Sequence, residues 1–127
     1  MFEHQKEART FRVLMGQPTE SFTPQTATLQ MQLIAEEYNE FLEAHAESLV
    51  YIQNKRAREH ALKELADIAY VCYQYAAAAG WDLDEALTRV HESNLSKLDD
   101  DLKPIKRADG KVMKGPNYKP ANLIDLV

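Results

Sequence analysis

The chain has 127 residues, of which 45% are hydrophobic, and a formal net charge of −5. Its length predicts one domain over residues 1–127, and its charge argues against a general nucleic-acid or membrane binder. No apolar run approaches the length of a membrane span, and the start, MFEHQKEART, is too charged for a signal peptide. With Cys72 as the one cysteine, no intrachain disulfide can form, and a cytoplasmic location is expected.

The first half of the chain predicts two helices. Residues 2–15 should form a short helix that ends before Gly16. Thr23 is the expected N-cap of a long helix, with Pro24 at its first position, where a missing N–H costs nothing. This second helix should reach about residue 48.

Two further helices follow. One should run from about 54 to 79 and end at Gly80. Asp82 should then cap a helix that reaches about residue 99, with Glu85 three residues on as a partial capping box. The fold class is therefore all-α, a helical bundle with an irregular basic C-terminal tail.

The tail is rich in proline, glycine and lysine, and Asp109-Gly110 predicts a tight turn. It can be a solvated surface segment or a lid that closes over an anion. Its basic residues between positions 103 and 119 face one acid, Asp109, and are Lys103, Lys106, Arg107, Lys111, Lys114 and Lys119.

The second helix places acids where apolar residues belong. At 100° per residue, Glu37 and Glu40 fall inside its apolar arc, and Glu36 lies at the margin of that arc. Glu43 falls outside it, where a solvent-facing acid is ordinary. The arc itself is formed by Leu29, Leu33, Ile34, Phe41 and Ala44.

The third helix repeats the anomaly. It is apolar almost all round, yet it contains Glu64 and Asp67 at i, i+3, which makes them neighbours on one face. Packed against the second helix, they would complete a group of four carboxylates that repel one another unless cations neutralise them. Oxygen-only ligands suit Mg²⁺ or Mn²⁺ better than zinc. The alternative is that these acids pair with lysines and arginines or line a wet groove.

The fourth helix carries polar groups on its apolar stripe. Asn94 lies at the centre of that stripe and Lys97 beside it, so Lys97 is a candidate for a phosphate contact. His60 and His91 are expected to be structural.

Three motifs in order carry a family resemblance. EEYNE (residues 36–40) followed by ELAD (64–67) resembles E-E-x-x-E … E-x-x-D, the pattern of the all-α nucleoside triphosphate pyrophosphohydrolases. That superfamily includes MazG, dimeric dUTPases and phosphoribosyl-ATP pyrophosphohydrolases. VHESNLSKL (90–98) and DGKVMKGPNYKPANL (109–123) resemble the C-terminal motifs of its single-domain MazG-like branch. Leu95 departs from the methionine expected there, a near-isosteric change.

The resemblance implies a homodimer or homotetramer that hydrolyses the α–β bond of a nucleoside triphosphate with two or more Mg²⁺ or Mn²⁺ ions per site. Neither nucleic acid nor membrane is implied as a partner. By position, the metal ligands would be Glu37, Glu40, Glu64 and Asp67. Glu36 would either hydrogen-bond to the groups that ligate the metal or orient the attacking water. The expected phosphate contacts are Asn94 and Lys97, with Lys97 acting in catalysis, and then Lys111, Lys114 and Tyr118.

The base and sugar stay open. A base pocket would involve the N-terminal segment, with Phe11 and Met15 as candidates. The branch includes housekeeping members and phage members that act on host deoxynucleotides, so dGTP and dUTP are both candidates, and a phage-encoded member would work in the host cytoplasm.

Two other classes of protein use acid-rich helices. A di-metal redox bundle needs Glu-x-x-His motifs, which this chain lacks. A non-catalytic helical interaction module, with the acids as a docking surface for a basic partner, is the alternative function, and metal-dependent release of pyrophosphate would separate the two.

Overall fold

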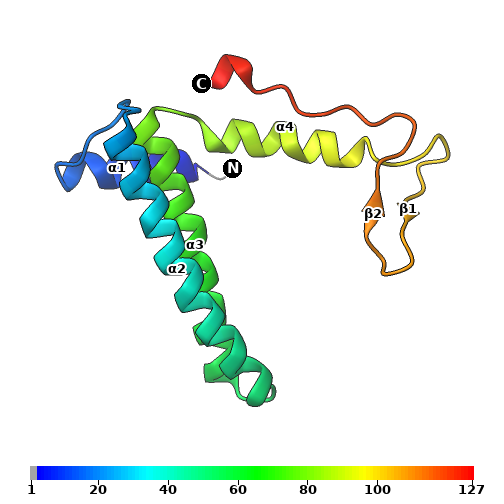
Figure 1. The fold of residues 1–127 in the computed structure, drawn as a ribbon, viewed down its shortest axis with the longest axis horizontal. Helices are drawn as coiled ribbons and strands as arrows, with labels where there is room; N and C mark the ends of the chain where they lie inside the picture. The colour runs from blue at the N-terminus through cyan, green and yellow to red at the C-terminus, as the bar shows by residue number, and fades with distance from the viewer. Residues whose placement is uncertain (1–2) are drawn as a thin grey trace. The chain divides into compact units, whose positions relative to one another are not determined.

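The computed structural model describes residues 3–127, and they are predominantly helical (Figure 1). The chain divides into two compact units, Met1–Trp81 and Asp82–Val127. The predicted all-α class is confirmed, with one two-stranded sheet in the tail. Within residues 3–127, no helix is both long and apolar enough to span a bilayer.

The first unit contains α1 (His4–Leu14), α2 (Pro24–Val50) and α3 (Lys55–Ala79). These bounds lie within two residues of the predicted ones, although the predicted start at residue 2 falls outside the described residues. Thr23 caps α2 as expected, through a reciprocal pair of hydrogen bonds with Thr26. Gly80 ends α3 in the left-handed conformation, at φ +84°.

A buried polar network fastens α1 to α3. Arg12 is 3% exposed, and burial lowers the pKa of its guanidinium. Its Nε donates to the carbonyl of Pro18 at 2.7 Å, and its Nη1 donates to Gln74 Oε1 at 3.3 Å. Gln74 Nε2 in turn donates to the carbonyl of Ala8 at 3.2 Å. Each polar group thus has a partner, as a buried position requires.

Among residues 3–127, the apolar residues that are fully buried are all small, while many large apolar side chains remain exposed. Leu29, Met31 and Tyr38 on α2 are each more than half exposed. A single chain therefore leaves much of its apolar surface uncovered. The buried apolar residues are Ala8, Ala44, Ala57, Ala76, Ala77 and Ala78.

The second unit begins with α4 (Leu83–Leu95), and Asp82 caps it by accepting a hydrogen bond from the Glu85 N–H. The predicted end near residue 99 is wrong, because α4 stops at Leu95. Residues 99–101 are three aspartates, which oppose the negative end of a helix dipole and favour turns. Asp99 Oδ1 indeed accepts from the backbone N–H groups of Asp101 and Lys103.

The tail contains a small antiparallel hairpin, β1 (Ile105–Lys106) and β2 (Val112–Met113), followed by η1 (Ile124–Leu126). The predicted turn at Asp109-Gly110 lies between the strands, with Gly110 at φ +90°. Residues 100–114 are all exposed, which matches the solvated-segment interpretation in the free chain.

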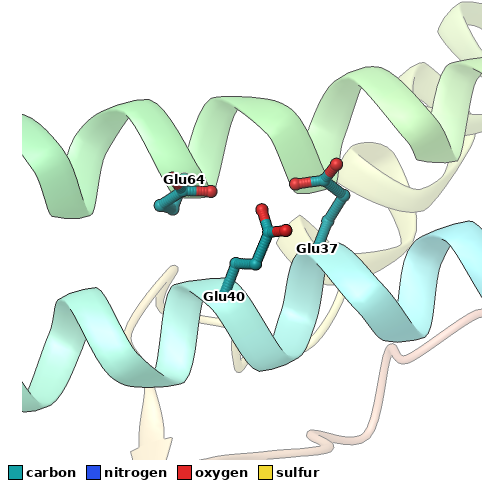
Figure 2. Close-up of side chains that lie close together, drawn as sticks. All are labelled: Glu37, Glu40 and Glu64. Carbon is teal, nitrogen blue, oxygen red and sulfur yellow. The ribbon is translucent and has the colours of Figure 1, made fainter.

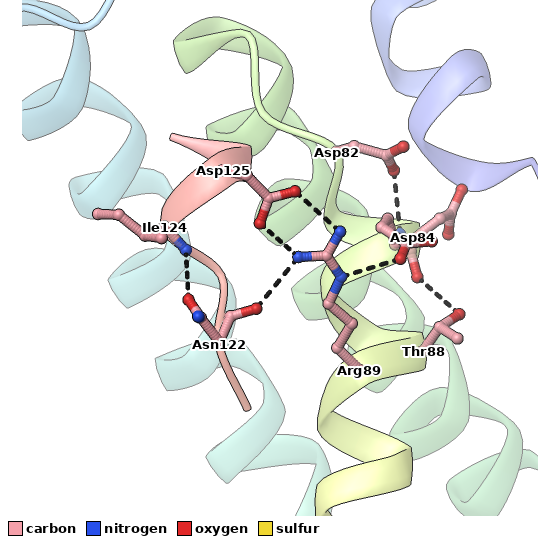
Figure 3. A network of polar contacts seen from close by, with 8 residues as sticks. Asp82, Asp84, Thr88, Arg89, Asn122, Ile124 and Asp125 are labelled. Atoms are coloured by element: carbon pink, nitrogen blue, oxygen red, sulfur yellow. Dashed lines mark hydrogen bonds and ion pairs between the residues drawn. The ribbon is translucent and has the colours of Figure 1, made fainter. Parts of the chain in front are cut away.

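The end of the tail is fastened to α4 within the second unit (Figure 3). Arg89 donates to both carboxylate oxygens of Asp125, at 2.6 and 3.0 Å, and to the carbonyl of Asn122 at 3.1 Å. The bonds to Asp125, together with a hydrogen bond to Glu85, raise the pKa of Arg89, and the bond from Arg89 lowers the pKa of Asp125. Ser93 Oγ also donates to the carbonyl of Lys119 at 2.7 Å. The exposed hairpin therefore lies between α4 and a C-terminal segment that is hydrogen-bonded back to α4.

Candidate metal site

Three carboxylates from two helices meet in the first unit. Glu37 and Glu40 project from α2 toward Glu64 on α3 (Figure 2). One oxygen from each lies within 4.8 Å of the others. The two α2 acids are one turn apart, and the antiparallel hairpin of α2 and α3 brings Glu64 opposite them. The predicted convergence of the two motifs is thus present for these three residues.

The cluster holds acid groups in an unfavourable setting. Glu64 has a side chain only 8% exposed, and its Oε2 is buried without a hydrogen-bond partner. The Oε2 of Glu37 is likewise buried and unpartnered. Burial raises the pKa of Glu37, the charge of Glu40 and a side-chain hydrogen bond with Glu40 raise it further, and the charges of Asp67 and Glu64 add to the effect. Buried carboxylate oxygens without partners are costly, and a cation is the group that would satisfy them.

The acids of α3 have basic neighbours that the sequence interpretation did not assign. His60 lies between two acids, with Nε2 3.3 Å from Glu64 Oε1 and Nδ1 3.5 Å from Glu47 Oε2. Lys63 Nζ lies 2.6 Å from Asp67 Oδ2 and 3.6 Å from Glu64 Oε1. The bond to Asp67 raises the pKa of Lys63. The i, i+4 spacing of the pairs His60/Glu64 and Lys63/Asp67 could have indicated these two contacts from the sequence.

The other predicted site residues of the first unit, Asp67 and Glu36, are not among the three acids whose oxygens lie within 4.8 Å of one another. Asp67 is half-buried and paired with Lys63, although its charge still contributes to the raised pKa of Glu37. Glu36 is exposed on α2. The predicted four-ligand set is therefore seen as three converging acids and one acid held by a lysine.

The predicted phosphate-binding residues belong to the second unit. Asn94 is exposed on α4, and the carbonyl of Asn94 accepts from the Lys97 N–H in the turn that ends the helix. Lys111 is exposed, and its backbone N–H donates to Asp109. Lys114 Nζ lies 4.8 Å from the centre of the Tyr118 ring, a cation–π distance.

The fold and the acid cluster define a class: an all-α protein whose long antiparallel helices present carboxylates suited to a hard divalent cation. The profile of the phosphoribosyl-ATP pyrophosphohydrolase family matches residues 8–94. The chain belongs to this family, and it is a pyrophosphohydrolase of nucleotide-like substrates. The match extends from α1 to α4 and includes every acid of the cluster. A search of curated proteins found no match.

We predict that Glu37→Gln raises the melting temperature of the protein in EDTA. The substitution removes a charge that burial and three acids disfavour, while it keeps the shape of the side chain. The raised pKa means that the Glu37 contribution to stability is fully present below the ordinary value of 4.5 and is lost as pH rises through the folded-state value. The difference between variant and wild type should therefore widen as the pH rises above 4.5.

Thermal denaturation monitored by circular dichroism measures this difference. Glu43→Gln is the matched control, because Glu43 is exposed on the same helix, and its melting temperature should not change. A Glu37→Gln variant less stable than wild type at pH 8 would contradict the electrostatic account of the cluster.

Proposed function

We propose that the protein hydrolyses the α–β phosphoanhydride bond of a nucleoside triphosphate, with Mg²⁺ or Mn²⁺, to a monophosphate and pyrophosphate. The observation that supports it most is the group of three acids with buried, unpartnered oxygens on α2 and α3. That group lies in a chain of the phosphoribosyl-ATP pyrophosphohydrolase family. Control of a nucleotide pool is the role that such a reaction suits.

The donor set fits a hard divalent cation. Glu37, Glu40 and Glu64 supply only carboxylate oxygens, and Asp67 adds another nearby. Two or more Mg²⁺ or Mn²⁺ ions are expected, because a triphosphate carries about four negative charges and cannot approach these acids unaccompanied. The bound metal would polarise phosphoryl oxygens and lower the pKa of a coordinated water.

The remaining residues have roles that follow from their charge. Glu36, exposed next to the cluster on α2, would orient the attacking water and accept its proton. The new bond joins the water oxygen to the α-phosphorus. The bond between the α-phosphorus and the bridging oxygen breaks, and its electron pair leaves with pyrophosphate. Lys97 would stabilise the charge that develops on the leaving group, and Asn94 and Tyr118 would donate to phosphate oxygens.

We expect Glu40→Gln and Glu64→Gln each to lower kcat/KM by about a hundredfold or more, equivalent to roughly 2.7 kcal/mol of transition-state stabilisation. Each change keeps the side-chain shape but removes a charge that the metal needs. Release of pyrophosphate from a nucleotide panel with Mg²⁺ or Mn²⁺ measures it. The panel includes dGTP, dUTP, the other deoxynucleotides and phosphoribosyl-ATP, which the family name indicates.

Glu43→Gln serves again as the control on α2 and should retain wild-type turnover. Near-normal activity of either Glu40→Gln or Glu64→Gln would show that the ligand assignment is wrong. Phosphate instead of pyrophosphate as the product would contradict the proposed bond.

A homo-oligomer is also proposed. The exposed faces of α2 and α3 carry large apolar side chains, while the buried apolar residues are alanines. Tyr70 and Leu65 on α3 are more than 40% exposed, and so are Leu49 and Tyr51 at the α2–α3 turn. Such faces are covered in solution when a second copy packs on them.

Light scattering coupled to size exclusion at micromolar concentration should therefore give two or four times the mass of the chain. The assembly should persist at high salt, because apolar burial rather than surface charge would hold it. A compact monomer at these concentrations would contradict this proposal.

The exposed hairpin is proposed to supply cations to the triphosphate. Lys111 and Lys114 lie on residues 105–114, which are exposed in the free chain. The double variant Lys111→Met/Lys114→Met should lower kcat/KM by about tenfold, or roughly 1.4 kcal/mol, with helicity unchanged. These substitutions are a cleaner test than truncation after Asp101, which would also remove the contacts of Asn122 and Asp125 with Arg89.

Lys106→Met is the control, because Lys106 is an exposed lysine of the same hairpin. Equal kcat/KM for wild type and the double variant, with identical amide exchange of residues 103–119 with and without nucleotide, would eliminate the lid.

A further inference from the structure

The acids of the site differ in how their charge is compensated. Among residues 3–127, neither Glu37 nor Glu40 forms an ion pair with a lysine, arginine or histidine. On α3, by contrast, Lys63 Nζ lies 2.6 Å from Asp67 Oδ2, a short charge-assisted contact. The cluster thus contains three acids that face one another and a fourth that already has a cation.

The ion pair of Lys63 with Asp67 competes with the binding of a metal ion by Asp67. An ammonium group and a divalent cation both need the lone pairs of the same carboxylate oxygens. Lys63 Nζ also lies 3.6 Å from Glu64 Oε1, so it spans the Glu64/Asp67 edge of the cluster. Glu64 Oε2, in contrast, is buried without a hydrogen-bond partner, so its lone pairs are not committed to a protein donor.

The exposure of Lys63 allows its ammonium group to move away from Asp67. Its side chain is 62% exposed, whereas the side chains of Asp67 and Glu64 are 33% and 8% exposed. Exposed ion pairs of this kind contribute little to stability, so a divalent ion can displace the ammonium at small cost. The long flexible stem lets the charge move into solvent or toward a bound phosphate.

Resting on the proposed metal function, we propose that Lys63 is an internal counter-ion of Asp67 that a divalent cation replaces. The preassembled ligands are Glu37, Glu40 and Glu64, and Asp67 joins them when Lys63 withdraws. Lys63 therefore lowers the affinity for metal alone, and it becomes available to an anionic substrate once the metal is bound.

The test is a double-mutant cycle measured by isothermal titration with Mn²⁺ in the absence of nucleotide. Lys63→Met should bind Mn²⁺ at least about threefold more tightly than wild type, because no ammonium has to be displaced. Methionine is of similar length and is a good helix former, so α3 should be retained. Lys55→Met, an exposed lysine at the start of the same helix, is the matched control and should change little.

The cycle separates exchange at Asp67 from general repulsion by a nearby positive charge. Exchange predicts that the gain from Lys63→Met disappears in the Asp67→Asn background, since the shared carboxylate is then gone. An equal gain in Mn²⁺ affinity in both backgrounds, or no gain in either, would overturn the role proposed for Lys63. Mn²⁺ binding by the wild type would still agree with the proposed metal-dependent function. Absence of Mn²⁺ binding by every variant and by wild type would overturn both.

Discussion

The packing of α2 against α3 is the constraint on which the rest of the site depends. The hairpin sets side chains of α2 against side chains of α3, and the acids that meet there are one turn apart on α2. Ala44, completely buried, lies one turn beyond Glu40, and Ala57 is buried two turns before Glu64. Small residues at a helix contact allow the axes to approach, so longer neighbours reach across the seam. The acid cluster is a consequence of this small-residue seam.

Much of this arrangement is local in origin, which is why the sequence predicts it. Thr23, Gly80 and Asp82 cap or end their helices through bonds to residues within a few positions, and those bonds do not depend on the tertiary fold. Helical periodicity places Glu37 and Glu40 on the buried side of α2. A short turn between α2 and α3 leaves an antiparallel pair as the simple solution, and Glu64 follows from it.

What the sequence did not predict depends on register and rotamer. The contact of His60 with Glu47 requires the relative register of α2 and α3, which periodicity alone does not set. Whether Lys63 turns toward Asp67 or toward solvent is a choice of rotamer. The clamp of Arg89 on Asp125 joins residues 36 positions apart through a segment without periodicity. The predicted end of α4 lies too far along the chain, because three aspartates follow the helix and disfavour its continuation.

The buried carboxylates of the site lower the stability of the fold. Buried oxygens on Glu37 and Glu64 lack hydrogen-bond partners, and the fully buried apolar residues among residues 3–127 are all alanines, so no large fully buried side chain offsets that cost. The partnered network of Arg12 and Gln74 secures α1 on α3 but lies on a different part of the hairpin. A second copy covering the exposed leucines and tyrosines would add apolar burial, and a divalent cation would remove the repulsion within the cluster. Assembly and metal binding would then stabilise the same helical pair, so a loss of either should weaken the other.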